Sequence, residues 1–178
     1  MRERMRDAAF AGNIKNWGGI VGGYLHTCGQ AFHAWPVADW NMFPRNKKLP
    51  ILMQKHPGSA DRAEIEAFQV LHELYDLGVP NGTAVVLDLE MAVAPFYVVR
   101  FGRVMHHFGY RVYPYGSSST LFKNPALDGY WVAAPLPSRA PYMHSHAHVI
   151  MTQYSLDSAP GVDRSTVRWR VQQSKWWV

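Results

Sequence analysis

Two acidic residues separated by one leucine carry the clearest chemical signal in the sequence. Asp88 and Glu90 come directly after the apolar run from Ala84 to Leu87. Residues two apart in a strand project to the same face with about 6.5 to 7 Å between their Cα atoms. Carboxyl groups about 5 to 9.5 Å apart can cleave a glycosidic bond, because one protonates the leaving oxygen while the other stabilises the developing positive charge. The alternative is that Asp88 caps a loop or pairs with an arginine, and that Glu90 begins the next helix.

The elements around these acids follow the order of a β/α unit. Apolar residues recur at helical spacing over residues 60–77, and Gly78 and Pro80 follow where a helix would end. Residues 83–89 are β-branched and apolar enough to form a strand that is buried on both faces, as in a parallel sheet. The stripe predicted to be the apolar face of the helix contains Ile65, Phe68, Leu71, Leu74 and Tyr75.

A second helix and several further strands complete the predicted pattern. Pro95 suits the first turn of a helix that runs to Phe108, and residues 111–116 form the next strand, which makes a parallel crossover. In parallel β/α barrels the loops after the strand ends build the active site, and Asp88 lies at such an end. Short strands are also predicted at residues 18–25, 50–54, 129–133 and 148–154, with a brief helix within 34–44.

Composition and charge limit the classes of protein that fit. The chain has 178 residues, 48% of them hydrophobic and 17% charged, which predicts one folded domain over residues 1–178. Cys28 is the one cysteine, so an intramolecular disulfide is excluded. The charged N-terminus predicts no Sec-type signal peptide, and no segment has the length of a membrane span. The net charge of +5 favours anionic partners, but no nucleic-acid-binding motif is present.

Six short motifs, in order along most of the chain, carry a resemblance to a known family. They are Gly23-Tyr24-Leu25, the connection from Leu77 to Thr83, Leu87-Asp88-Leu89-Glu90, Tyr115-Gly116-Ser117, Tyr130-Trp131-Val132-Ala133, and Thr152-Gln153-Tyr154 with Val162-Asp163. In this order they resemble the lysozyme-like glycoside hydrolases of family 25 and related glycosidase-like barrels of actinobacteria and their phages.

The resemblance implies a fold and an activity. The fold would be α/β: a single TIM-like β/α barrel, irregular, with helices lost in its second half. The activity would be that of a muramidase on bacterial cell-wall peptidoglycan, with no cofactor. Glu90 would be the general acid, Asp88 the stabilising or nucleophile-assisting carboxylate, and Asp163 a further acidic group. The residues implied to contact the glycan are Tyr24, Tyr115, Trp131, Gln153 and Tyr154.

The family also has an aspartate at the end of its first strand, for which Asp7 is the candidate here. Residues 2–6 are Arg-Glu-Arg-Met-Arg, a sequence too charged for a buried barrel strand. Either the first strand is degraded or this carboxylate is missing.

Three alternating histidines raise the question of a metal site. In a strand, His144, His146 and His148 would face the same way, which is a geometry that zinc can use. Histidines beside a proline-rich loop are also common without any metal, and no acidic residue nearby in the sequence could support them. No metal ligand is therefore assigned.

The aromatic C-terminus supports a second hypothesis. Trp176 and Trp177 at the end of the chain are hard to bury in the same domain, which favours a virion or self-assembly contact through this tail. The protein would then be a catalytically decayed barrel that serves as a structural or cell-wall-binding component of a phage virion. Under either hypothesis, the expected location is the virion, or the host cytoplasm before release.

Overall fold

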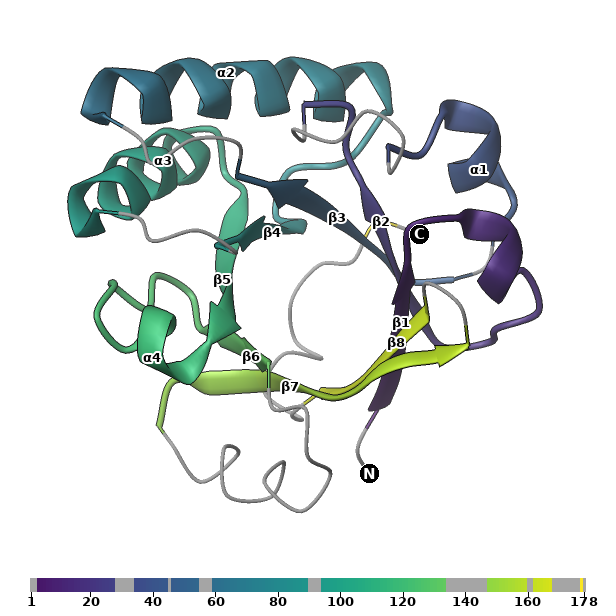
Figure 1. Cartoon of the computed structure of the whole chain (residues 1–178). Coiled ribbons are helices and arrows are strands. Elements are labelled where there is room, and N and C mark those ends of the chain that lie inside the picture. The colour runs from purple at the N-terminus through teal and green to yellow at the C-terminus, as the bar shows by residue number, and fades with distance from the viewer. Residues whose placement is uncertain are drawn as a thin grey trace.

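Eight strands form a closed barrel in which each strand pairs with the next and β8 returns to β1 (Figure 1). The pairs from β1 to β7 are parallel, and β8 is antiparallel to both of its neighbours. The prediction of a TIM-like α/β barrel is confirmed, with one reversed strand. The strands are β1 (Glu3–Ala8), β2 (Ile20–Tyr24), β3 (Lys48–Met53), β4 (Ala84–Asp88), β5 (Arg111–Ser117), β6 (Tyr130–Ala133), β7 (Val149–Ala159) and β8 (Val162–Val167).

The computed structural model describes residues 3–27, 34–44, 46–54, 59–89, 94–133, 147–159, 162–167 and 177. Several residues named above lie outside the described residues. They are Cys28, Glu90, His144, His146 and Trp176.

The helices lie outside the barrel and are concentrated in its first half. α2 and α3 pack side by side against the outside of the β3 to β5 region (Figure 1). After β5, the described residues form one helix of four residues, which confirms the loss of helices in the second half. None of the helices described is long and apolar enough to cross a lipid bilayer. The helices are η1 (Ala11–Ile14, a 3-10 helix), α1 (Val37–Asn41), α2 (Ala60–Asp76), α3 (Pro95–His107) and α4 (Ser118–Leu121).

Alternation along the strands separates a core inside the barrel from a core between the strands and the helices. Val86 on β4 belongs to the inner cluster, whereas Leu87 and Leu89, the residue that follows the strand, belong to the outer one. Asp88 therefore points to the same side as Val86, into the barrel. The buried inner cluster consists of Met5, Ile20, Leu49, Ile51, Ala84, Val86, Tyr113, Trp131, Met151 and Val167.

The charged N-terminal segment forms a regular barrel strand, so the expectation of a degraded first strand is wrong. Alternation directs Met5 and Asp7 into the barrel and leaves Arg4 exposed and Arg6 partly exposed. The guanidinium of Arg6 lies 4.2 Å from the ring centroid of Trp17, a cation–π contact. The charges are tolerated because they lie on the outer face of β1.

The buried face of α2 also differs from the prediction. Ile65, Phe68 and Tyr75 are 50%, 53% and 81% exposed. Leu74 is buried as predicted. The small residues Ala63 and Ala67 also lie on the inner face, where their short side chains let the helix approach the barrel closely. The buried residues of α2 are Ala63, Glu66, Ala67, Val70 and Leu74.

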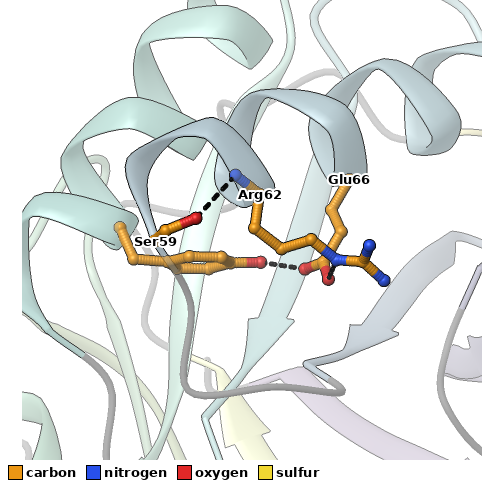
Figure 2. A network of polar contacts seen from close by, with 4 residues as sticks. Ser59, Arg62 and Glu66 are labelled. Carbon is orange, nitrogen blue, oxygen red and sulfur yellow. Dashed lines mark hydrogen bonds and ion pairs between the residues drawn. The ribbon is translucent and has the colours of Figure 1, made fainter.

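A polar network joins the first turns of α2 and α3 and accounts for the buried Glu66. The carboxylate of Glu66 accepts a hydrogen bond from the Tyr97 hydroxyl and one from Arg62 Nε at 3.0 Å. Ser59 caps the same helix by accepting from the Arg62 backbone N–H at 3.2 Å (Figure 2). The buried carboxylate is thus paired and hydrogen-bonded, as its burial requires.

Candidate active site

Three aspartates from separate strands converge at one end of the barrel, and we call Asp7, Asp88 and Asp163 the carboxylate cluster. The parallel strands β1 and β4 end there, at Ala8 and Asp88. β8 runs in the opposite direction, so Asp163, the second residue of the strand, lies at the same end. This is the end at which β/α barrels build their active sites. Asp88 and Asp163 were predicted from the sequence to lie together, and the structure brings them together.

Asp7 and Asp163 face each other directly across the antiparallel β1–β8 ladder. Side chains opposite each other in such a pair have Cβ atoms about 4.5 to 5.5 Å apart. Asp7 is 4% exposed, and its Oδ1 has no hydrogen-bond partner among the described residues. Burial, and secondly the negative charge of Asp163, raise the pKa of Asp7 to about 8. Asp7 is therefore mainly protonated at neutral pH.

Gly22 on β2 provides the space that Asp7 occupies. The two residues are partners in the β1–β2 ladder. A Cβ atom at Gly22 would lie 2.8 Å from the Cβ of Asp7 and 2.6 Å from the Cε of Met5. A side chain at this position would displace the first carboxyl group of the cluster.

Tyr24, the last residue of β2, interacts electrostatically with all three aspartates. Its pKa is raised well above the usual value, first by burial and then by the negative groups Asp7, Asp88, Tyr115 and Asp163. The phenol therefore keeps its proton and can donate a hydrogen bond within the cluster.

Asp88 ends β4 and is 1% exposed. It lies between Met53 of β3 and Tyr115 of β5 in the sheet register. The next residue, Leu89, donates its backbone N–H to the carbonyl of Tyr115 at 2.9 Å and is buried in the outer core. The predicted alternation of Asp88 and Leu89 is confirmed. The role of Glu90, which lies outside the described residues, stays a prediction.

A hydrogen-bonded chain runs from β5 through β7 to β8. The Tyr115 hydroxyl donates to Oε1 of Gln153, and Nε2 of Gln153 donates to Oδ2 of Asp163 at 2.6 Å. Gln153 is 1% exposed, whereas Tyr115 and Asp163 are partly exposed. The resemblance implies that Gln153 contacts the glycan, and this stays a prediction. In the structure its buried amide bonds to two neighbouring side chains.

Trp131 packs against Tyr115, the first residue of this hydrogen-bonded chain. Its ring centroid is 4.7 Å from that of Tyr115, and its indole N–H donates to the Ser165 hydroxyl at 3.1 Å. Both Trp131 and Ser165 are buried. Sequence reasoning missed Ser165, since a lone serine in a strand carries no distinguishing pattern. In this structure the buried ring of Trp131 packs against the ring of Tyr115.

Two other residues singled out in the sequence have no described contact with the cluster. Tyr154 sits at a register irregularity between Gln153 and Ser155, and no hydrogen bond or ring contact described joins it to the cluster. His148 is exposed just before β7 begins, at the opposite end of the barrel, and its ring approaches Tyr130. Among the described residues, no group of three or more His, Cys, Asp or Glu could hold a metal ion.

Trp177 is buried within its own chain. It is 8% exposed, its ring lies 4.9 Å from that of Trp40, and its carbonyl accepts from the Lys48 N–H at 2.8 Å. The Lys48 ammonium lies 4.8 Å from the Trp177 ring centroid. The expectation that this residue is hard to bury in the same domain is wrong, because α1 and β3 provide a place for it.

Two surface hollows beside α2 are separate from the carboxylate cluster. One, of about 340 Å³, is lined by aromatic residues that include Phe68 and Phe108. The other, of about 380 Å³, is lined by residues that include His26 and Glu73. Neither is lined by any of the inward-facing groups described above.

No protein-family model and no curated protein matches this sequence. Solved structures match its fold. An uncharacterized protein of B. stearothermophilus has a TM-score of 0.75 and 18% identity over 95% of this chain and 97% of that chain. The Tat-secreted protein Rv2525c of Mycobacterium tuberculosis, in complex with HEPES, has a TM-score of 0.70 and 16% identity over 99% of each chain.

A cell-wall lytic enzyme is also similar in fold. The modular autolysin LytC from Streptococcus pneumoniae, solved in complex with a synthetic peptidoglycan ligand, has a TM-score of 0.60 and 16% identity. The match covers 94% of this chain and 47% of that chain. At these identities the likeness shows the fold alone.

Proposed function

We propose that this protein is a glycosidase-like, muramidase-type enzyme that acts on cell-wall peptidoglycan. The observation that carries the proposal is the convergence of Asp7, Asp88 and Asp163 at the end of the barrel where β/α enzymes carry their catalytic residues. The fold shared with the peptidoglycan-bound autolysin LytC supports the choice of substrate. Proximity of several carboxyl groups is what acid-assisted cleavage of a glycosidic bond requires.

The proposed roles follow from protonation and position. Glu90, two residues after Asp88 in the sequence, protonates the leaving oxygen. Asp88 stabilises the positive charge that develops on the sugar. Asp7, protonated at neutral pH, contributes a hydrogen-bond donor and no negative charge. This arrangement keeps the negative charge on the residues that face the developing cation.

The partly exposed members of the site contact the glycan in this proposal. Tyr24, Tyr115 and Asp163 all retain some exposure, in contrast to Asp7 and Asp88. An aromatic ring offers a face on which the apolar side of a sugar can rest, and its hydroxyl can bond to the sugar hydroxyls. The buried residues Asp7 and Asp88 then act at the glycosidic bond that is cleaved.

The test compares wild-type protein with Glu90→Gln and Asp88→Asn on purified peptidoglycan. Release of reducing ends should fall by about 100-fold or more in each variant, since a positioned acid contributes about 10²- to 10⁴-fold. Thr152→Val is the matched control, because Thr152 is buried on β7 next to Gln153 and alternation turns it toward the outer face.

Binding to insoluble peptidoglycan is measured on the same samples. Wild-type protein that sediments with peptidoglycan without releasing reducing ends would identify a wall-binding barrel and reject the enzymatic proposal. Equal activity in wild type and Glu90→Gln would remove Glu90 from the mechanism.

A further inference from the structure

We propose that Gln153 is a positioning residue: its amide group holds the carboxylate of Asp163 and the hydroxyl of Tyr115 in fixed positions relative to each other. This inference rests on the proposed glycosidase function. The two contacts of its amide group, one to each neighbour, carry the proposal.

The amide of Gln153 is fixed at both ends. Its oxygen accepts from Tyr115 and its nitrogen donates to Asp163 at 2.6 Å, while the side chain is 1% exposed. A carboxamide is planar, so the two contacts lie at opposite ends of one rigid group. Any rotation that improves one contact disturbs the other.

The elements on either side of Gln153 are also fixed. Asp163 is held by its place opposite Asp7 in the β1–β8 ladder. Tyr115 packs against Trp131 with ring centroids 4.7 Å apart. Gln153 itself pairs with Ala133 of β6 and Ser165 of β8. The chain therefore links three strands that have little freedom to move.

The direction of the chain follows from the charge of Asp163. An ionised carboxylate can only accept hydrogen bonds, so it must face the NH₂ end of the amide. The amide oxygen then faces Tyr115, whose hydroxyl can only donate to it. The proton of Tyr115 is thus used inside the protein, and its hydroxyl is held in one direction.

Protonation of Asp163 would remove the charge that orients the amide of Gln153. A neutral carboxyl group can donate, and its hydrogen bond from Nε2 loses the strength that the charge provides. Asp7 on β1 lies opposite Asp163, and Tyr24 on β2 interacts electrostatically with Asp163 as well as with Asp88 on β4 and Tyr115 on β5. Gln153 provides a donor for the ionised form of Asp163 amid these acidic groups.

The experiment uses Gln153→Met, which keeps the approximate size of the side chain but removes both hydrogen-bonding ends. The rates on purified peptidoglycan are measured against pH. We expect kcat/KM to fall by about 10-fold, the loss of one charge-assisted hydrogen bond, because Asp163 and Tyr115 both lose their fixed positions. The acid limb of the profile should move up by about one pH unit, because the ionised carboxylate loses a donor.

Two further variants separate the contacts. Tyr115→Phe keeps the contact between Gln153 and Asp163, so its acid limb should stay within about 0.3 pH units of wild type while KM rises. Gln153→Glu removes the NH₂ donor and adds a negative charge, so its acid limb should move at least as far as that of Gln153→Met. Thr152→Val, the control on the other face of β7, should match wild type.

A readout without substrate keeps this inference apart from the proposed function. Carboxyl ¹³C NMR follows the titration of Asp163 in wild type, Gln153→Met and Gln153→Glu. A titration that moves upward in both variants supports the positioning role, even where wild type fails to cleave peptidoglycan and the proposed reaction is rejected. The positioning role is overturned if the Asp163 titration is unchanged in a variant that folds. Either of the two variants is sufficient for this test.

Discussion

Asp7 and Asp163 face each other across the ladder between β1 and β8. These two strands close the barrel, because the last strand pairs with the first. Two carboxyl groups in register cannot both carry a charge without a cost. Burial of Asp7 decides which of them keeps its proton. Burial inside the closed barrel, and secondly the charge of Asp163 opposite, thus keep Asp7 protonated at neutral pH.

The raised pKa of Asp7 predicts a specific dependence of stability on pH. The group titrates near 3.8 when unfolded and at about 8 when folded, so between these values the folded state binds more protons. Its contribution to the free energy of unfolding therefore falls by about 1.4 kcal/mol per pH unit as pH rises through this window. Urea unfolding at pH 4 to 9 should show this slope in wild type, and Asp7→Asn should lack it. Parallel curves for the two proteins would contradict the prediction.

Gly22→Ala tests whether the space beside Asp7 is needed. The new Cβ would overlap Met5, Asp7 and Ile51 at 2.6, 2.8 and 3.0 Å. Overpacking of this kind costs about 1 to 3 kcal/mol. Gly12→Ala is the control, since nothing lies within 4 Å of a Cβ there. Chemical denaturation should show the loss in Gly22→Ala alone, and equal midpoints for both variants would mean that the barrel relaxes around the methyl group.

Much of the architecture could be predicted because periodicity and end signals agree with it. Ser59 and Gly78 bracket α2, and Pro95 begins α3. The apolar run before Asp88 becomes the buried strand β4. Where local preference and tertiary packing point the same way, a single sequence is sufficient.

The predictions for β1 and α2 were wrong because the face that each element buries is decided only by the closed barrel. The charges of β1 suggested an exposed segment, since the inward positions of Met5 and Asp7 become evident only with β2 and β8 in place. On α2, large apolar residues suggested the inner face, but Ala63 and Ala67 pack there. For this reason the sequence alone leaves it open whether Asp7 supplies the aspartate at the end of the first strand. The two internal contacts of Gln153 have no pattern in the sequence.

The network around Glu66 predicts a strong response to removal of one partner. Tyr97→Phe deletes the hydroxyl that donates to the buried carboxylate. We expect a loss of about 1 to 3 kcal/mol, because a buried acceptor loses a donor. Tyr97→Phe combined with Glu66→Gln should cost less than the sum of the single changes, since both remove the same contact. Strict additivity in a double-mutant cycle would show that the two side chains do not interact.

Trp177→Ala distinguishes an internal role of the C-terminal tryptophan from a role in assembly. The ring is buried against Trp40 and under the Lys48 ammonium, and its backbone bonds to Lys48. Truncation of a buried tryptophan costs about 3 to 5 kcal/mol, so the melting temperature should fall markedly. Size-exclusion chromatography should give the same elution volume for the variant and wild type, because Trp177 is buried in the outer core of its own chain. Deletion of residues 165–178 is a poor test of assembly, since it would also remove half of β8. A change in elution volume with an unchanged melting temperature would instead assign Trp177 to an interface between molecules.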